Sequence, residues 1–195
     1  MALTDIMIDL ETLDVLPTAT ILTIGAVKFN PFGDLANEKQ ETFYVKVDVD
    51  SCDRIGATVS QSTLDWWASQ TAEAQAAAFD PTDRIDINDA IAQLYKFCWG
   101  AKRVWSHGAG FDVIILEHYF RKVGKAIPWS FWEVRDTRTI FDIGINPQRP
   151  ATKTAHHALA DAVDQAIGVQ NVYRTLRSST MSDGNYIAPL AKERL

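Results

Sequence analysis

Two acidic side chains near the N-terminus have a spacing that suits metal binding. Asp9 and Glu11 lie two residues apart in 5–12, a mostly apolar run with β-branched residues. Such a run predicts a β-strand, on which residues two apart point to the same face. The two carboxylates repel each other unless a cation neutralises them, and their oxygens suit Mg²⁺ or Mn²⁺. The alternative is an acidic strand end in solvent.

A third acid, Asp112, lies where we expect a junction from strand through loop to helix. It follows the glycine-containing loop 107–110 and stands near the start of a helix expected over 111–123. Free backbone N–H groups stabilise a carboxylate in that place, so helix capping is the alternative to a role in chemistry. The glycines suit both interpretations, because they let the backbone come close to a ligand or another element.

A histidine and an acid occur together near the start of the last predicted helix, in His156-His157-Ala158-Leu159-Ala160-Asp161. His157 and Asp161 are four residues apart and share one face of a helix. His156 is five residues from Asp161 and converges with it only if His156 precedes the regular helix. Spacing alone therefore favours His157, and a solvated histidine pair is the alternative.

The order of these three groups is more specific than any one of them. Asp-x-Glu on a first strand, then a glycine-rich loop with Phe-Asp, then His-x-Ala-Leu-x-Asp on a late helix, resembles the DEDDh group of 3′–5′ exonucleases. The resemblance covers residues 4–175, and 24–27 also fits the family's second strand. One departure is Gly108, where the second motif often has Asn. A substrate or backbone contact is therefore absent or replaced there.

A tryptophan pair resembles one branch of that family. Trp66-Trp67 after 62–64 looks like the phage exonuclease A-type branch, which also contains bacterial RNA-trimming relatives. The tryptophans are interpreted as a platform that stacks on terminal bases or as core residues. Trp67 is expected to be mainly structural, and Trp66 is as well suited to the site as to the core.

The resemblance implies a fold, a set of metal ligands and a general base. The fold is α/β and ribonuclease H-like, with a five-stranded mixed sheet (an antiparallel meander first, then parallel strands) flanked by helices. Two divalent cations, Mg²⁺ or Mn²⁺, are implied at Asp9, Glu11, Asp112 and Asp161. The family's pattern puts the general base on His156, which overrules the spacing argument for His157.

The implied activity is metal-dependent 3′–5′ release of 5′-mononucleotides from single-stranded nucleic-acid ends, with DNA preferred over RNA. The alternatives are a 3′–5′ exoribonuclease that trims RNA ends, an endonuclease on the same fold, and an inactive nucleic-acid-binding module. The expected substrate contacts are Thr12, Leu13, Trp66, His107, Phe111 and Arg138. Candidates for phosphate contacts in the basic middle segment are Arg135, Arg138, Arg149 and Lys153.

Alternating strand and helix patterns are expected to position these residues. The expected strands are 5–12, 21–29, 41–49, 103–106 and one around Val134. The expected helices are 60–70, 72–79, 86–99, 111–123, 137–143 and 156–177. We expect one exonuclease domain over 1–177 and a C-terminal extension over 178–195. The aromatic residues from Trp129 to Trp132 are interpreted as a homodimer interface or a lid beside the site.

Composition limits the class of protein. The 195 residues are 47% hydrophobic, which excludes a disordered chain, and the net charge is −6. The first hundred residues hold 16 acidic and 6 basic side chains, and 101–155 hold 5 acidic and 9 basic. This imbalance argues against sequence-blind adhesion to nucleic acid, so an anionic substrate is met locally or through metal ions. Two cysteines, no apolar run of about 18 residues and no basic leader predict a cytoplasmic protein of a bacterium or a phage-infected host.

Overall fold

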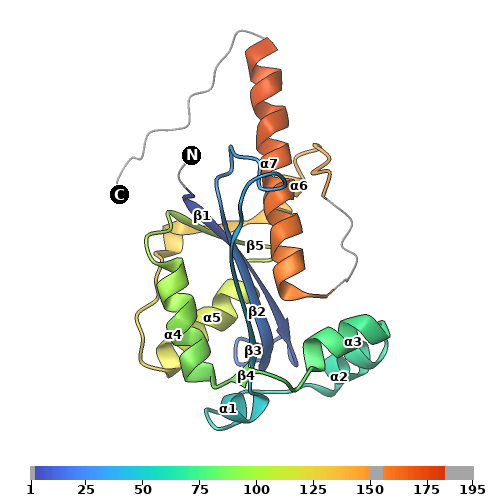
Figure 1. Ribbon diagram of the computed structural model, residues 1–195, viewed down its shortest axis with the longest axis vertical. Coiled ribbons are helices and arrows are strands. Elements are labelled where there is room, and N and C mark those ends of the chain that lie inside the picture. The colour runs from blue at the N-terminus through green and yellow to red at the C-terminus, as the bar shows by residue number, and fades with distance from the viewer. Residues whose placement is uncertain (1–2, 150–155, 183–195) are drawn as a thin grey trace.

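The computed structural model describes residues 3–149 and 156–182, with side chains through Ser178. Its centre is a six-stranded mixed sheet of order β4-β3-β2-β1-β5-β6 (Figure 1). The strands are β1 (Asp5–Thr12), β2 (Ile21–Phe29), β3 (Glu41–Val47), β4 (Arg84–Ile85), β5 (Arg103–Ser106) and β6 (Val134–Asp136). β1, β2 and β3 form an antiparallel meander, and β5 and β6 extend the sheet parallel to β1. An antiparallel meander followed by parallel strands is the predicted order of the sheet.

The sheet differs from the sequence-based expectation in two details. A sixth strand, β4, pairs parallel with β3, and its two residues are too few to show an alternating pattern. β3 ends two residues earlier than expected, because the chain turns there into a short helix, α1 (Val49–Asp53). The Asp48 side chain caps this helix by accepting a hydrogen bond from the Asp50 backbone N–H.

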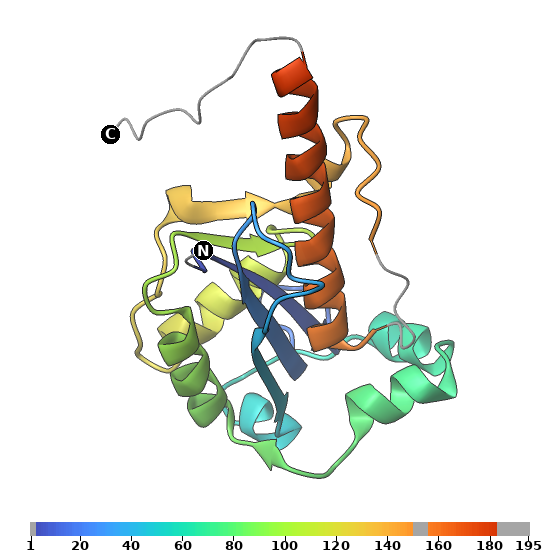
Figure 2. The ribbon, with the colours of Figure 1, turned by 45° about the horizontal axis from the view of Figure 1, so that its top comes forward.

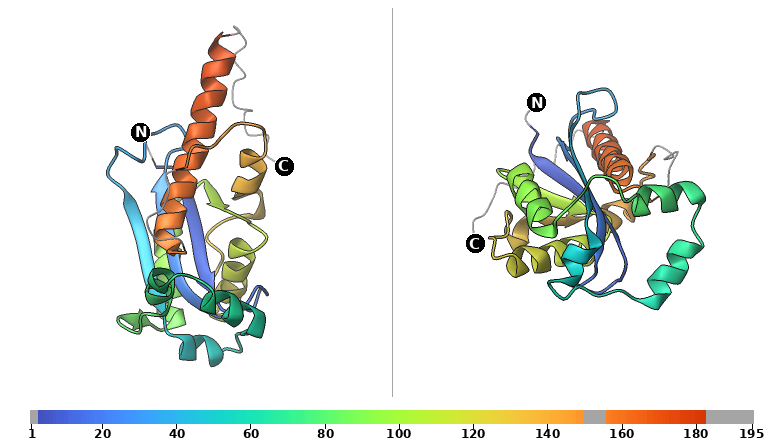
Figure 3. Two further views of the ribbon diagram at one scale, coloured as in Figure 1. Left: turned by 90° about the vertical axis from the view of Figure 1, so that its right-hand side faces the viewer. Right: turned by 60° about the horizontal axis from the view of Figure 1, so that its bottom comes forward.

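Helices cover both faces of the sheet (Figure 3). They are α2 (Gln61–Ala68), α3 (Ala72–Phe79), α4 (Ile87–Cys98), α5 (Asp112–Lys122), α6 (Thr137–Phe141) and α7 (Ala158–Ser182), with a 3₁₀ turn at Phe131–Glu133. Alternation along β1 separates two cores. Ile6, Ile8 and Leu10 join the core under α4 and α5, whereas Met7 joins the core under α7. Asp9 and Glu11 therefore emerge on the face that α7 covers.

The last helix begins later and ends later than predicted. It begins at Ala158, two residues after the expected start, and it continues through Ser182 rather than ending at 177. Residues 183–195 lie outside the described residues, so the division into a domain over 1–177 and an extension over 178–195 stays a prediction. Cys52 and Cys98 are buried and free. Within 3–149 and 156–182 no helix is long and apolar enough to cross a membrane.

α7 lies along β1 and β2, and its first turn rests directly on the backbone of β2 (Figure 2). The contact point is Gly25, where a β-carbon would collide with the carbonyl carbon of Ala158 and the nitrogen of Leu159. Only glycine permits backbone to approach backbone this closely. Gly25, which lies opposite Asp9 in the sheet, therefore sets the distance between β2 and the start of α7.

Gly25→Ala is expected to destabilise the protein by about 3 kcal/mol, because the added methyl group forces the start of α7 away from β2. The measurement is the free energy of unfolding from urea titration. Gly110→Ala is the control, since a β-carbon there meets nothing within 4 Å. Equal stability of the two variants contradicts the close approach.

Candidate metal and catalytic site

The acidic pair on β1 lies at the strand end next to the start of α7. Asp9 is opposite Gly25 in the β1–β2 register, and Glu11 is opposite Thr23. Glu11 is buried, with 6% of its surface exposed. The same-face placement that the spacing predicted is therefore present, and α7 brings further polar groups to it.

Asp112 reaches the pair from the opposite core. It is the first residue of α5 and is 3% exposed. Its Oδ1 accepts a hydrogen bond from the backbone N–H of Leu10 at 3.1 Å. Because Leu10 lies between Asp9 and Glu11, this bond fixes the third carboxylate beside the first two. Asp112 therefore joins β1 to α5 across the sheet, which a simple helix cap would not do.

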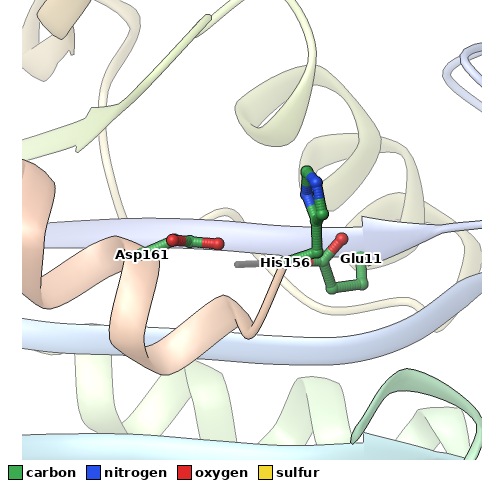
Figure 4. A group of neighbouring side chains, drawn as sticks. All are labelled: Glu11, His156 and Asp161. Carbon is green, nitrogen blue, oxygen red and sulfur yellow. The ribbon is translucent and has the colours of Figure 1, made fainter. Parts of the chain in front are cut away.

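The histidine beside the acids is His156. It precedes α7 with a left-handed φ of 61°, so its ring is not bound to helical spacing. One ligand atom each from Glu11, His156 and Asp161 lies within 4.8 Å of the others. Figure 4 shows the three side chains, which come from β1 and the start of α7. These residues can hold a metal ion. The spacing argument for His157 is thereby corrected, although the catalytic role of His156 stays a prediction.

His157 has a different environment. Its ring stacks on Tyr44 of β3, with centroids 4.7 Å apart and planes 19° apart. Its Nδ1 accepts a hydrogen bond from the Ala160 backbone N–H at 3.4 Å, and its carbonyl accepts one from Asp161 N at 3.0 Å. His157 therefore lies at the junction between the loop and α7, and its contacts position His156 and Asp161 in the site.

Burial and mutual repulsion raise the pKa values of the acids. Burial raises the pKa of Glu11 to about 8, with the charges of Asp161 and Asp112 adding to it. Burial raises the pKa of Asp112 to about 7. The pKa of Asp9 is raised well above its ordinary value by burial and then by Asp112 and Glu11. Burial also raises the pKa of Asp161, while nearby His156 opposes that rise.

This donor set fits hard divalent cations. Neighbouring carboxylates repel one another and resist ionisation, and a bound cation removes that repulsion. Gln165 is a second indication that the site suits a cation. Its Nε2 donates to Asp9 Oδ1 at 2.8 Å, while its buried Oε1 has no hydrogen-bond partner among the described residues. Sequence reasoning missed Gln165, although it is four residues after Asp161 and so on the same helical face.

These pKa shifts predict how stability depends on pH without metal. Raised folded-state pKa values mean that the folded protein binds more protons than the unfolded chain. The stabilisation is complete below the ordinary carboxyl pKa values and is lost as pH rises through about 7 for Asp112 and about 8 for Glu11. In EDTA the melting temperature is expected to fall by about 5 °C or more between pH 6 and 9.

Mg²⁺ or Mn²⁺ is expected to reduce that fall, because a bound cation favours the ionised carboxylates. The matched control is Asp112→Asn, which removes one titrating group and makes the EDTA profile flatter. A melting temperature that rises from pH 6 to 9 in EDTA contradicts the prediction. Scanning calorimetry in a series of buffers measures both profiles.

The structure separates the two tryptophans of α2. Trp67 is 2% exposed and its Nε1 donates to the carbonyl of Thr12 at 2.8 Å, which joins α2 to the end of β1. Trp66 is 43% exposed and meets the His156 ring edge-on, with centroids 4.8 Å apart. Trp66 is thus the one placed to meet a ligand, and Trp67 belongs to the core.

The other expected substrate contacts are dispersed. Leu13 is buried in a core cluster with Trp67, and its contact with substrate stays a prediction. Thr12 is buried and donates its hydroxyl to the Asp14 carbonyl at 2.7 Å, so it too is turned from solvent. Phe111 is half-buried against the main core directly before Asp112. The aromatic pair within 129–132 is exposed at Phe131 and Trp132.

His107 and Arg138 lie on the β5–β6 side of the acids. The Nδ1 of His107 hydrogen-bonds with the Thr137 hydroxyl at 2.8 Å. The Nε of Arg138 lies 3.4 Å from where a β-carbon on Gly108 would stand, and Gly108 has a φ of 117°. At Gly108, where the family often has Asn, the backbone therefore carries no side chain, and the guanidinium of Arg138 lies beside it. Of the other phosphate candidates, Arg135 donates to two backbone carbonyls, and Lys153 lies outside the described residues.

Comparison with known proteins agrees with this geometry. Residues 4–173 match the family described as the 3′–5′ exoribonuclease Rv2179c-like domain. An exodeoxyribonuclease of Enterobacteria phage T4 is 24% identical over 158 residues, which is 69% of this chain and 69% of the phage protein.

Two solved structures are similar at lower sequence identity. The nuclease domain of 3′hExo, a DEDDh family member solved with bound rAMP, has a TM-score of 0.49 and 17% identity, and the match covers 89% of this chain and 92% of that chain. The Neurospora crassa Pan2 catalytic unit has a TM-score of 0.46 and 18% identity, and the match covers 93% of this chain and 28% of that chain. The family match spans most of the sequence and includes the acids on β1, α5 and α7. The chain therefore belongs to the Rv2179c-like 3′–5′ exoribonuclease domain family and is a 3′–5′ exonuclease of the DEDDh type.

Proposed function

We propose that the protein removes 5′-mononucleotides from the 3′ ends of single-stranded nucleic acid with the help of two divalent cations, Mg²⁺ or Mn²⁺. The observation that supports this most is the convergence of Glu11, His156 and Asp161 within 4.8 Å. Asp9 and Asp112 stand beside them with raised pKa values. These five groups come from three parts of the chain, and the four carboxylates would hold the cations.

Bound divalent cations supply charge neutralisation and an activated water for hydrolysis of a phosphodiester. His156 accepts the proton of the attacking water, because its ring lies beside Glu11 and Asp161. Glu11 orients the water and the terminal nucleotide. Gln165 holds Asp9 in place through its 2.8 Å hydrogen bond, and the exposed ring of Trp66 stacks on the terminal base.

The sugar of the substrate is a separate question. The family's description names an exoribonuclease and the phage relative is an exodeoxyribonuclease. Discrimination depends on contacts to a 2′-hydroxyl. DNA and RNA of one sequence are therefore tested side by side, and the faster substrate assigns the sugar.

The test is digestion of single-stranded DNA and RNA oligomers labelled at the 3′ or the 5′ end, with a circular single strand as the matched control. We expect 3′ label to appear at once as mononucleotide, 5′ label to appear as a ladder that shortens from the 3′ end, and the circle to stay intact. EDTA is expected to stop the reaction. Cleavage of the circle would favour the endonuclease alternative, and cleavage in EDTA would exclude the metal-dependent mechanism.

A further inference from the structure

Two guanidinium groups beside His107, which follows β5, form no salt bridge in the described part of the chain. Arg138 and Arg149 are exposed, and neither has a carboxylate oxygen within 4.0 Å among residues 3–149 and 156–182. Other arginines of the described chain do have such partners, namely Arg54, Arg103, Arg121 and Arg174. The charge of Arg149 acts on Asp164, and those of Asp136 and Asp142 act on His107. Guanidinium groups that form no salt bridge still offer their N–H donors to an anionic ligand.

The two side chains are supported rather than free in solvent. Arg138 stands over the backbone of Gly108, 3.4 Å from the position of a missing β-carbon. Arg149 lies over the ring of Phe141, with 5.3 Å between its Cζ and the ring centroid. Its methylene chain also fills the space above Gly168, since a β-carbon there would lie 2.7 Å from its Cγ. Arg138 is thus supported by the loop at Gly108, and Arg149 by α6 and α7.

His107 shows that the two arginines act on one region. Its ring lies 5.9 Å from that of Phe141. Its pKa is lowered by burial, then by the charge of Arg138 and then by that of Arg149. We call Arg138, Arg149 and the His107 and Phe141 rings between them the arginine patch.

The arginine patch and His156 lie on opposite sides of the carboxylates. β1, β5 and β6 are parallel neighbours, so their carboxyl ends share one edge of the sheet. Glu11 stands at the end of β1, Asp112 follows β5, and Arg138 follows β6. His156 lies toward the other side, because the start of α7 rests on Gly25 of β2 and His157 stacks on Tyr44 of β3. The order across the edge is therefore His156, carboxylates, arginine patch.

In-line displacement determines in which direction the substrate strand runs across this edge of the sheet. The attacking water and the leaving oxygen take opposite sides of the phosphorus. Release of a 5′-mononucleotide breaks the bond between phosphorus and the 3′ oxygen of the preceding nucleotide. The water adds to phosphorus, its proton goes to His156, and the leaving 3′ oxygen takes a proton from solvent. The remaining strand therefore departs on the side away from His156.

We propose that Arg138 and Arg149 form a subsite for the phosphates immediately 5′ of the cleaved bond, so that the retained strand runs from the carboxylates over the ends of β5 and β6. This inference rests on the proposed function, since the direction follows from His156 as the base. Two positive charges contact the sugar–phosphate backbone and no base edge, so the subsite is blind to sequence.

The test uses the double variant Arg138→Gln/Arg149→Gln on two substrates. One is a single-stranded decamer, and the other is the p-nitrophenyl ester of thymidine 5′-phosphate, which has no phosphate 5′ of the cleaved bond. We expect KM for the decamer to rise about 10-fold at unchanged kcat, with the ester unaffected. The slope of log KM against log salt is expected to decrease by about 1.4, because each lost phosphate contact on a single strand accounts for about 0.7.

The controls separate charge from structure. Arg121→Gln removes an exposed arginine that pairs with Glu117 on α5, and it should change neither substrate. Arg138→Lys/Arg149→Lys keeps both charges and should restore most of the affinity for the decamer. The single Gln variants, each expected to raise KM about 3-fold, give the same answer if the double variant does not fold.

The outcomes distinguish the subsite from the proposed function. An unchanged KM for the decamer, or an equal loss on the decamer and the ester, overturns the subsite. If the unaltered protein cleaves neither substrate with Mg²⁺ or Mn²⁺, the proposed function itself fails, whatever the variants do.

Discussion

Asp9→Asn is expected to reduce kcat on a single-stranded oligomer at least about 1,000-fold while the protein stays folded. Asp9 sits among three other acids, and its charge is one of those that cations would neutralise. The substitution removes one negative charge at nearly constant volume. Its amide oxygen still accepts the hydrogen bond from Gln165 Nε2, which is 2.8 Å long with Asp9. The loss is therefore one of metal binding and not of structure.

Two measurements separate those explanations. Kinetics with Mg²⁺ gives the loss of turnover, and calorimetry in EDTA gives the stability. Without metal, Asp9→Asn should be at least as stable as the unaltered protein, because repulsion by Asp112 and Glu11 is relieved. Asp34→Asn is the matched control, since Asp34 lies in the β2–β3 loop and pairs loosely with Arg174 at 4.0 Å. Near-normal turnover by Asp9→Asn would falsify the metal assignment.

His156→Ala is expected to lower kcat about 100- to 10,000-fold, whereas His157→Ala lowers it less than about 10-fold. The difference follows from placement. The His156 ring stands with Glu11 and Asp161, and the His157 ring stacks on Tyr44. Losing His156 removes the proton acceptor, and losing His157 removes a stacking contact and a helix-start hydrogen bond.

His156→Ala is therefore expected to lose mainly activity, and His157→Ala is expected to lose mainly stability. His157→Ala is expected to cost about 1 kcal/mol of unfolding free energy, from the lost stack and the lost bond to Ala160. His156→Ala should unfold close to the unaltered protein. Urea titration and single-turnover kinetics on each variant give both quantities. A larger loss of turnover in His157→Ala would return the base to the residue that helical spacing favours.

Three strands of the sheet were predictable because each has a strong local pattern. β1, β2 and β5 were expected with the bounds that the structure has, since apolar and β-branched residues mark buried strands. β4 was not, because Arg84–Ile85 forms only through pairing with β3. The end of α7 was predicted too early. No local stop signal in 178–182 shows where the helix ends, and the structure continues it through Ser182.

Contacts between distant segments set the limits of sequence reasoning at the site. Gln165 reaches Asp9 across 156 positions of the chain, and Trp67 reaches the Thr12 carbonyl across 55. A glutamine on a helix face carries no sign of such a partner. Packing of Leu13 against Trp67 in a core cluster is likewise a contact between distant segments that no local pattern indicates.

The sequence alone determined the types of chemistry available: acids two apart on a strand, an acid at a helix start, and a histidine and an acid at a later one. These follow from local periodicity, which a few neighbouring residues specify. Only the tertiary structure decided which histidine meets the acids and which tryptophan stays exposed beside that histidine. A left-handed turn at His156 and the close approach of α7 to Gly25 place the first, and the hydrogen bond from Trp67 to the Thr12 carbonyl buries the other tryptophan. The approach to Gly25 and the bond to Thr12 are contacts between segments far apart in the chain.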